Sequence, residues 1–146
     1  MTLEPVIRPA TSADAPALEV LVRQLGYDER AADIAARLAA LEQAGLVTLV
    51  AELDDRVVGC LTSSIMPVLH RPKPVGRISM MVVLEDLRGQ RIGERLVRAA
   101  EAWLKQQGCG MIEVTSNVQR TDAHRFYERI GYEKTSWRFA VDGDKQ

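Results

Sequence analysis

The sequence has few of the residues that build metal sites, disulfide scaffolds or membrane segments. Its 146 residues include two cysteines, Cys60 and Cys109, and two histidines, without the spacing of metal ligands, so we expect no metal. Two isolated thiols are typical of a reduced, cytoplasmic protein. The apolar runs are too short to span a bilayer as a helix, and the start, MTLEPVIRP, lacks the pattern of a secretion signal. We therefore expect no membrane partner.

The sequence also lacks an excess of charge of one sign. Its 19 basic and 20 acidic residues give a formal net charge of −1. A protein that binds nucleic acid by neutralising many phosphates would be more basic, so we expect no nucleic-acid partner. The length and the 47% share of hydrophobic residues suit one globular domain over residues 1–146.

Hydrophobic periodicity, glycines and prolines predict an alternation of strands and helices. The apolar stripe of the second helix contains small alanines, which allow close packing or a groove. The predicted elements are, in order, a strand at 6–8, helices at 12–25 and 28–44, strands at 46–53, 56–66 and 75–84, a helix at 89–107, a strand at 111–115, a helix at 122–130 and a strand at 132–141.

This order, β-α-α-β-β-β-α-β-α-β, predicts an α/β (α+β) domain with a mixed sheet and helices on both faces. A turn at Asp54-Asp55 joins two strands as an antiparallel hairpin. A helix joins the strands at 75–84 and 111–115, and such a connection makes that pair parallel.

The segment MMVVLEDLRGQRIGERL, residues 80–96, places a turn with glycines between a strand and a helix start. A helix start exposes unpaired N–H groups and the positive end of the helix dipole. Gly89 and Gly93 let an anion approach the backbone, and the positive charges of Arg88 and Arg91 become favourable there once an anion binds. We interpret the segment as a diphosphate site, with a solvated basic turn as the alternative. It matches neither the P-loop pattern nor GxGxxG.

Two motifs in this sequence resemble those of the GNAT superfamily of N-acetyltransferases. The run RGQRIG at 88–93 is similar to (Q/R)-x-x-G-x-(G/A), and AHRFYERIGY at 123–132 is similar to A-x-x-F-Y-x-x-x-G-[FY]. Together with the element order, the resemblance covers nearly the whole chain. The middle glycine of the first motif is Arg91 here, which suits a binding loop when residue 91 has ordinary helical φ, as a helix start permits.

The resemblance implies a GNAT-like fold and transfer of the acetyl group of acetyl-coenzyme A to a primary amine, by direct attack through a tetrahedral intermediate. The strands around Met81–Val83 and Ile112–Thr115 would diverge around the pantetheine arm. A bulge in the first strand would aim a backbone N–H group of Met81, Val82 or Val83 at the thioester oxygen. The residues that would hold the pyrophosphate are Arg88, Gly89, Gln90, Arg91, Ile92 and Gly93.

The resemblance also suggests side chains for proton transfer. Tyr127 matches the family tyrosine that protonates the departing thiolate, and a half-buried aromatic is the alternative. Glu113 is the candidate base for the amine, with an exposed strand residue as the alternative, and Asn117 is a candidate contact for coenzyme A. Further residues that could relay a proton through water are Ser79, Glu52 and His70.

No motif identifies the acceptor beyond a small-molecule or peptide amine. Trp137 and the C-terminal strand are a candidate homodimer interface. Two other functions stay open: a non-catalytic coenzyme A-binding or protein-interaction domain of the same fold, and a nucleotide-binding domain that uses the same loop. Release of thiol from acetyl-coenzyme A, binding without turnover, or preferential binding of ATP would distinguish the three.

Overall fold

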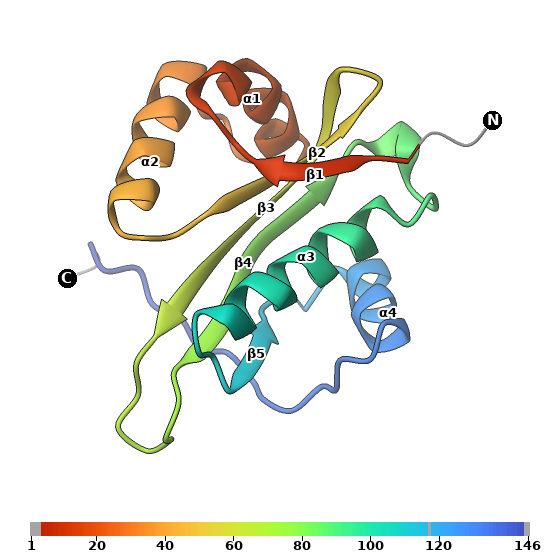
Figure 1. Ribbon diagram of the computed structural model, residues 1–146. Helices are drawn as coiled ribbons and strands as arrows, with labels where there is room; N and C mark the ends of the chain where they lie inside the picture. Colours follow the sequence, from red (N-terminus) through yellow and green to blue (C-terminus); the bar gives the residue numbers. More distant parts are fainter. Residues whose placement is uncertain (1–3, 117, 145–146) are drawn as a thin grey trace. The chain divides into compact units, whose positions relative to one another are not determined.

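The computed structural model describes residues 4–116 and 118–144, which fall into two compact units (Figure 1). The first unit ends at Val114 and contains the whole sheet, and the second begins at Thr115. The single domain expected over residues 1–146 stays a prediction. Within the described ranges, no helix combines the length and the apolar character needed to cross a bilayer.

The first unit is built on a mixed sheet of five strands in the order β1-β2-β3-β4-β5. The first four strands pair antiparallel, and β5 runs parallel to β4, as predicted. Asp54 and Asp55, with φ of 52° and 61°, form the predicted hairpin turn in left-handed backbone that matches the twist of the strands. The strands are β1 Val6–Pro9, β2 Thr48–Leu53, β3 Arg56–Met66, β4 Val75–Val83 and β5 Met111–Val114.

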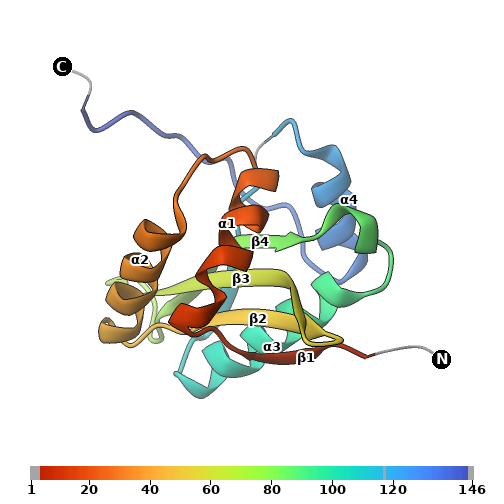
Figure 2. The same cartoon turned by 90° about the horizontal axis from the view of Figure 1, so that it is seen from above.

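Helices cover both faces of this sheet, which confirms the predicted fold class (Figure 2). Helices α1 (Ala15–Gln24) and α2 (Ala31–Gln43) lie on one face and α3 (Ile92–Gln106) lies on the other. Two short 3-10 helices, η1 (Ser12–Asp14) and η2 (Glu85–Leu87), precede α1 and α3. The buried face of α3 recurs at helical spacing and consists of Ile92, Leu96, Val97, Ala100 and Leu104.

Two glycines let α3 approach the sheet closely. A Cβ atom at Gly59 would lie 3.0 Å from Leu96 Cδ1, and one at Gly76 would lie 3.0 Å from both Cδ atoms of Leu104. A larger residue at either position would push α3 away from β3 and β4. The other face of the same strands is closed by a separate core cluster from α1, α2 and the sheet, whose buried members are Ala15, Leu18, Leu21, Ile34, Val50, Cys60 and Val82.

The second unit contains α4 (Thr121–Arg129) and a C-terminal segment without regular structure. The strand predicted over 132–141 is wrong, because no strand ladder includes any of the described residues after Val114. Trp137, Phe139 and Val141 are 71%, 92% and 82% exposed. Their alternation and β-propensity suit a pleated surface packed on one side, and propensity alone does not make a strand without that packing.

Candidate functional site

Strand β4 contains a β-bulge at Ser79. Thr62 pairs with Met80 and Ser63 pairs with Ile78, so Ser79 is an extra residue on β4. The bulge that the resemblance implied is therefore present in this strand, shortly before Met81. The Ser79 hydroxyl lies 2.9 Å from the Thr62 hydroxyl, so these two side chains form a polar pair at the bulge.

The edge of β4 that faces β5 opens at the bulge. The parallel pairing runs from Val75 with Met111 to Ile78 with Val114 and ends there. From Ser79 to Val83, no described strand continues along this edge, whereas the opposite edge stays paired with β3. Pairing along this edge thus ends at the bulge, where β5 itself ends at Val114, and the divergence that the resemblance implies stays a prediction.

The hydrogen bonds around Leu84 fix which backbone groups face the open edge. The Leu84 N–H donates to the Val58 carbonyl of β3 at 2.8 Å. Because successive residues of an antiparallel strand turn their backbone groups to opposite sides, Val82 also faces β3, where it pairs with Cys60. Met81 and Val83 consequently direct their N–H and carbonyl groups away from β3.

A glutamine from α1 binds the end of β4. The Gln24 side-chain amide donates to the Val83 carbonyl at 2.7 Å, and its oxygen accepts the Glu85 N–H at 3.0 Å. These two bonds fix the chain where it leaves the sheet toward η2. The sequence carries no signal for this contact, because a glutamine in the last turn of a helix is ordinarily a surface residue.

The turn before α3 is exposed from Arg88 to Arg91 and contains two positive φ angles, 86° at Gly89 and 64° at Arg91. Arg91 is the N-cap of α3 and has left-handed backbone, so the expectation of ordinary helical φ at this residue is wrong. The chain enters α3 from a turn that needs positive φ, a conformation that favours glycine. The glycine of the family signature is thereby explained, and a side chain here costs about 1–2 kcal/mol.

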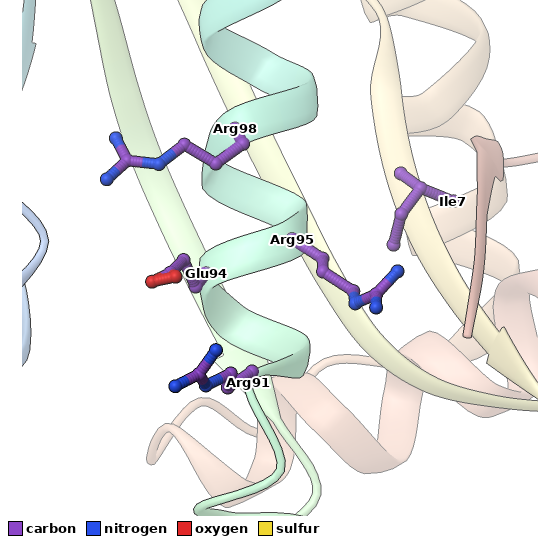
Figure 3. Close-up of a pocket in the computed structure, with 5 residues that line it drawn as sticks. All are labelled: Ile7, Arg91, Glu94, Arg95 and Arg98. Atoms are coloured by element: carbon purple, nitrogen blue, oxygen red, sulfur yellow. The ribbon is translucent and has the colours of Figure 1, made fainter. Parts of the chain in front are cut away.

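A pocket of about 430 Å³ lies beside this helix start (Figure 3). Arg95 extends from α3 toward β1 and pairs with Glu4 at 3.1 Å, whereas Arg98 extends to the other side and pairs with Glu101 at 3.0 Å. Because Arg95 and Arg98 are paired and Glu94 also lines the pocket, its suitability for an anion such as a diphosphate depends on the exposed Arg91 and on the amides of the first helical turn. The lining residues are Ile7, Arg91, Glu94, Arg95 and Arg98.

A second pocket, of about 290 Å³, lies on the face covered by α1 and α2. Cys60, Thr62 and Met80 of the sheet contribute to its lining. The alanine-containing apolar stripe of α2 was the sequence signal for a groove here. Burial raises the pKa of the Cys60 thiol to about 12, so this cysteine stays protonated and is no nucleophile.

The candidate proton-transfer groups of the first unit lie in different parts of the fold, and two of them are in ion pairs. Arg77 of β4 donates to Glu113 of β5 at 3.1 Å, across a directly opposed pair. Glu52 is bound by Arg8 at 2.6 Å, and His70 lies in an exposed loop. Only Ser79 lies at the bulge itself. Asn117 lies outside the described residues.

Tyr127 lies on α4 in the second unit. Its ring contacts Phe126 edge-to-face at 5.1 Å between centroids, and Tyr132 at 5.9 Å. Burial raises the pKa of the phenol above its usual value, and the positive charge of Arg120 partly opposes this shift. The phenol is therefore protonated at neutral pH, as a proton donor must be.

Comparison with known proteins identifies relatives of this sequence. Residues 14–132 match the model of the "Acetyltransferase (GNAT) family". An aminoglycoside N(6′)-acetyltransferase type 1 of Stenotrophomonas maltophilia is 30% identical over 90% of this chain and 88% of its own length. An aminoalkylphosphonate N-acetyltransferase of Salmonella typhimurium is 40% identical over 59% of this chain, and that match spans 56% of the relative.

A solved structure shares the fold. The aminoglycoside N-acetyltransferase AAC(6′)-Iy, in complex with CoA, superposes with a TM-score of 0.87 at 19% identity, over 99% of this chain and 98% of that protein. At this level of identity, the likeness concerns the arrangement of strands and helices. It agrees with the sheet order and the helix placement described above.

Proposed function

Because this chain belongs to the GNAT family of acetyltransferases and is an acyltransferase, we propose that it moves the acetyl group of acetyl-coenzyme A to a primary amine. Family membership confirms the resemblance of the two sequence motifs. Small-molecule amines are the proposed acceptors, because the relatives are named for aminoglycosides and aminoalkylphosphonates. The two isolated cysteines support action in the cytoplasm.

The observation that carries the proposal is the combination of an open strand edge and an exposed basic helix start within one short segment. The edge of β4 opens at Ser79, and the exposed turn with positive φ ends at Arg91, directly before α3. A long ligand with a diphosphate and an amide-rich arm suits such a segment. The residues proposed to hold the diphosphate are Arg88, Gly89, Gln90, Arg91, Ile92 and Gly93.

Acetyl-coenzyme A supplies an activated thioester when it is bound. The N–H groups of Met81 and Val83, which point away from β3, are proposed to stabilise negative charge on the thioester oxygen. We assign the proton donor for the leaving thiolate to Tyr127 and the acceptor of the amine proton to Glu113. One C–N bond forms and one C–S bond breaks. The ammonium group loses two protons, one to Glu113 and one to solvent, while Tyr127 gives its proton to the sulfur and regains one from solvent.

The test is binding of coenzyme A, measured by calorimetry, together with thiol release from acetyl-coenzyme A and an amine panel. Gly89→Ala places a side chain at a φ of 86°, where the backbone is strained. We expect it to weaken binding at least tenfold. Gly45→Ala, with φ of 78° at the end of α2, carries a similar strain outside the turn and should leave binding unchanged.

A chain that does not bind coenzyme A at millimolar concentration would contradict the proposal. Binding without turnover across the amine panel would instead favour the second candidate, a non-catalytic coenzyme A-binding domain. The replacement of the signature glycine by Arg91 motivates that candidate. Better binding of ATP than of coenzyme A would favour a nucleotide-binding domain.

A further inference from the structure

The pocket on the α1 and α2 face reaches the bulge of β4. Thr62 and Met80 line it, and the Thr62 hydroxyl lies 2.9 Å from that of Ser79, the bulge residue. A molecule in this pocket therefore lies beside the strand segment proposed above to hold the acetyl group. The hydroxyl pair gives that end of the pocket hydrogen-bonding capacity for an amine.

Most of the remaining lining is apolar. Leu18 and Val22 of α1 line it together with Leu38 and Leu41 of α2. Its volume of about 290 Å³ lies just below the range for ligand sites, roughly 300–1,000 Å³. Such a space accepts a compact body with a hydrocarbon surface.

The charged residues of the lining neutralise each other. Glu29 and Arg37 form an ion pair at 3.0 Å, and both side chains are partly exposed. Because the carboxylate of Glu29 is already paired with Arg37, it attracts a cationic ligand group less than an unpaired carboxylate would. Any further ammonium group deeper in the pocket would lose its hydration against apolar side chains, which is unfavourable without a partner.

From this charge pattern, and resting on the acetyltransferase function proposed above, we infer that the acceptor is a compact primary amine with one positive charge and an apolar alkyl or arylalkyl body. The amine binds at the end formed by Thr62 and Ser79, and the apolar body lies between α1 and α2. The pocket thereby selects against polycations such as polyamines and aminoglycosides, because its lining offers them a carboxylate already bound by arginine.

The test compares amines at saturating acetyl-coenzyme A by the rate of thiol release. From propylamine to hexylamine, kcat/KM should rise about threefold to fourfold per methylene. The kcat/KM for hexylamine should be at least ten times that for 1,6-diaminohexane, which has the same carbon chain and a second ammonium group. Spermidine and kanamycin should be poorer still. A series that is flat in chain length, or a preference for spermidine or kanamycin, would overturn the inference.

A matched pair of variants tests whether the preference among amines arises in this pocket. Leu38→Glu places a carboxylate in the pocket, and it should lower kcat/KM for hexylamine at least tenfold while reversing the preference toward 1,6-diaminohexane. Ala39→Glu makes the same change at the exposed neighbouring position of α2 and should leave the preference as it is. Equal effects of the two variants would contradict the placement. Leu38→Met conserves volume and polarity, so it should retain the hexylamine preference. It is the conservative control at this position if the glutamate variant does not fold.

Failure of this inference differs from failure of the proposed function. Binding of coenzyme A with faster acetylation of kanamycin or spermidine overturns the pocket assignment and leaves the acetyltransferase function intact. Absence of both coenzyme A binding and thiol release with every amine overturns the function, and the acceptor assignment with it.

Discussion

The side-chain amide of Gln24 is hydrogen-bonded to the backbone carbonyl of Val83 at 2.7 Å, and its oxygen also accepts the Glu85 N–H. Gln24 is the last residue of α1, which lines the apolar pocket, and Val83 is the last residue of β4. The wall of the proposed acceptor pocket and the proposed acetyl-binding strand are therefore joined through one side chain. We therefore predict that Gln24 positions both proposed substrates.

Replacing Gln24 should weaken acetyl-coenzyme A binding without abolishing the fold. Gln24→Glu loses the donor to the Val83 carbonyl, and we expect Kd to rise about threefold to tenfold and stability to fall by about 1 kcal/mol. Calorimetry and urea unfolding measure the two quantities. Gln43→Glu, at an exposed position in the last turn of α2, is the control. If Gln24→Glu changes stability but not Kd, the contact is structural only.

The left-handed backbone of Arg91 predicts an unusual order of stabilities. Arg91→Gly should be more stable than Arg91→Ala by about 1 kcal/mol, because glycine adopts a φ of 64° without a steric cost. At Arg95, inside α3, the order should be opposite, since glycine is less stable than alanine in a helix by about 1 kcal/mol. Urea unfolding of the four variants measures their stabilities. The same order of the glycine and alanine variants at both positions would rule out backbone strain at Arg91.

The sequence predicts the elements best where local signals agree. The hairpin at Asp54-Asp55 and the strand at 56–66 follow from period and turn residues alone, and the structure confirms both. The prediction from sequence fails at 132–141, where alternation predicts a strand. Strand pairing depends on partners that the local sequence does not specify. Likewise, the φ of Arg91 depends on the whole turn, and a helix start by itself suggested a right-handed value.

The candidate site divides in the same way. The segment proposed to bind the cofactor was predicted from motif spacing, because glycines and a helix start leave a local pattern, and this assignment stays a prediction. The Gln24 contact and the Glu29–Arg37 pair were not found. Gln24 and Val83 lie far apart in the chain, and only the tertiary fold brings a helix end to a strand end. A glutamine or an ion pair at such positions looks like ordinary surface in the sequence.

Acid should weaken the fold through Asp14. Hydrogen bonds from Arg8, both at 2.9 Å, lower the pKa of Asp14 below its usual value, against burial, which raises it. A lowered folded-state pKa stabilises the protein above the unfolded value of about 3.9, and this stability is lost as pH falls through the folded-state pKa. We expect Asp14→Asn to cost about 2 kcal/mol at pH 7 and progressively less below pH 4.

Urea unfolding between pH 7 and pH 2.5 measures this difference. Asp33→Asn, at an exposed position on α2, is the matched control and should follow the unmodified protein throughout. A cost of Asp14→Asn that stays constant down to pH 2.5 would show that the carboxylate charge is not what stabilises the Arg8 contact.

Tyr127→Phe should lower kcat about 100-fold while leaving the KM for acetyl-coenzyme A nearly unchanged, because a general acid acts on the leaving group. Burial raises the pKa of Tyr127, so the donor stays protonated at pH 9, and we expect no loss of kcat between pH 7 and pH 9. Tyr132→Phe, whose ring contacts Tyr127 at 5.9 Å, is the control for packing. Equal losses in both variants would argue against the acid role.

A base role for Glu113 predicts rescue by pH. Glu113→Gln keeps the shape of the side chain beside Arg77 and removes the proton acceptor. At pH 7 an alkylamine is almost wholly protonated, since its pKa is near that of lysine, about 10.4. We therefore expect kcat/KM to fall about tenfold or more at pH 7, and the loss to shrink toward pH 10 as the free amine becomes abundant.

Glu19→Gln separates this role from the loss of an ion pair. Glu19 pairs with Arg23 at 3.2 Å, as Glu113 pairs with Arg77 at 3.1 Å, so both substitutions remove a carboxylate from a guanidinium. The control should leave kcat/KM unchanged across the pH range. A loss in Glu113→Gln that is the same at pH 7 and pH 10 would instead assign Glu113 to holding β4 and β5 together. In that case, the amine proton leaves through water, and Ser79 at the bulge becomes the first side chain to test as a relay.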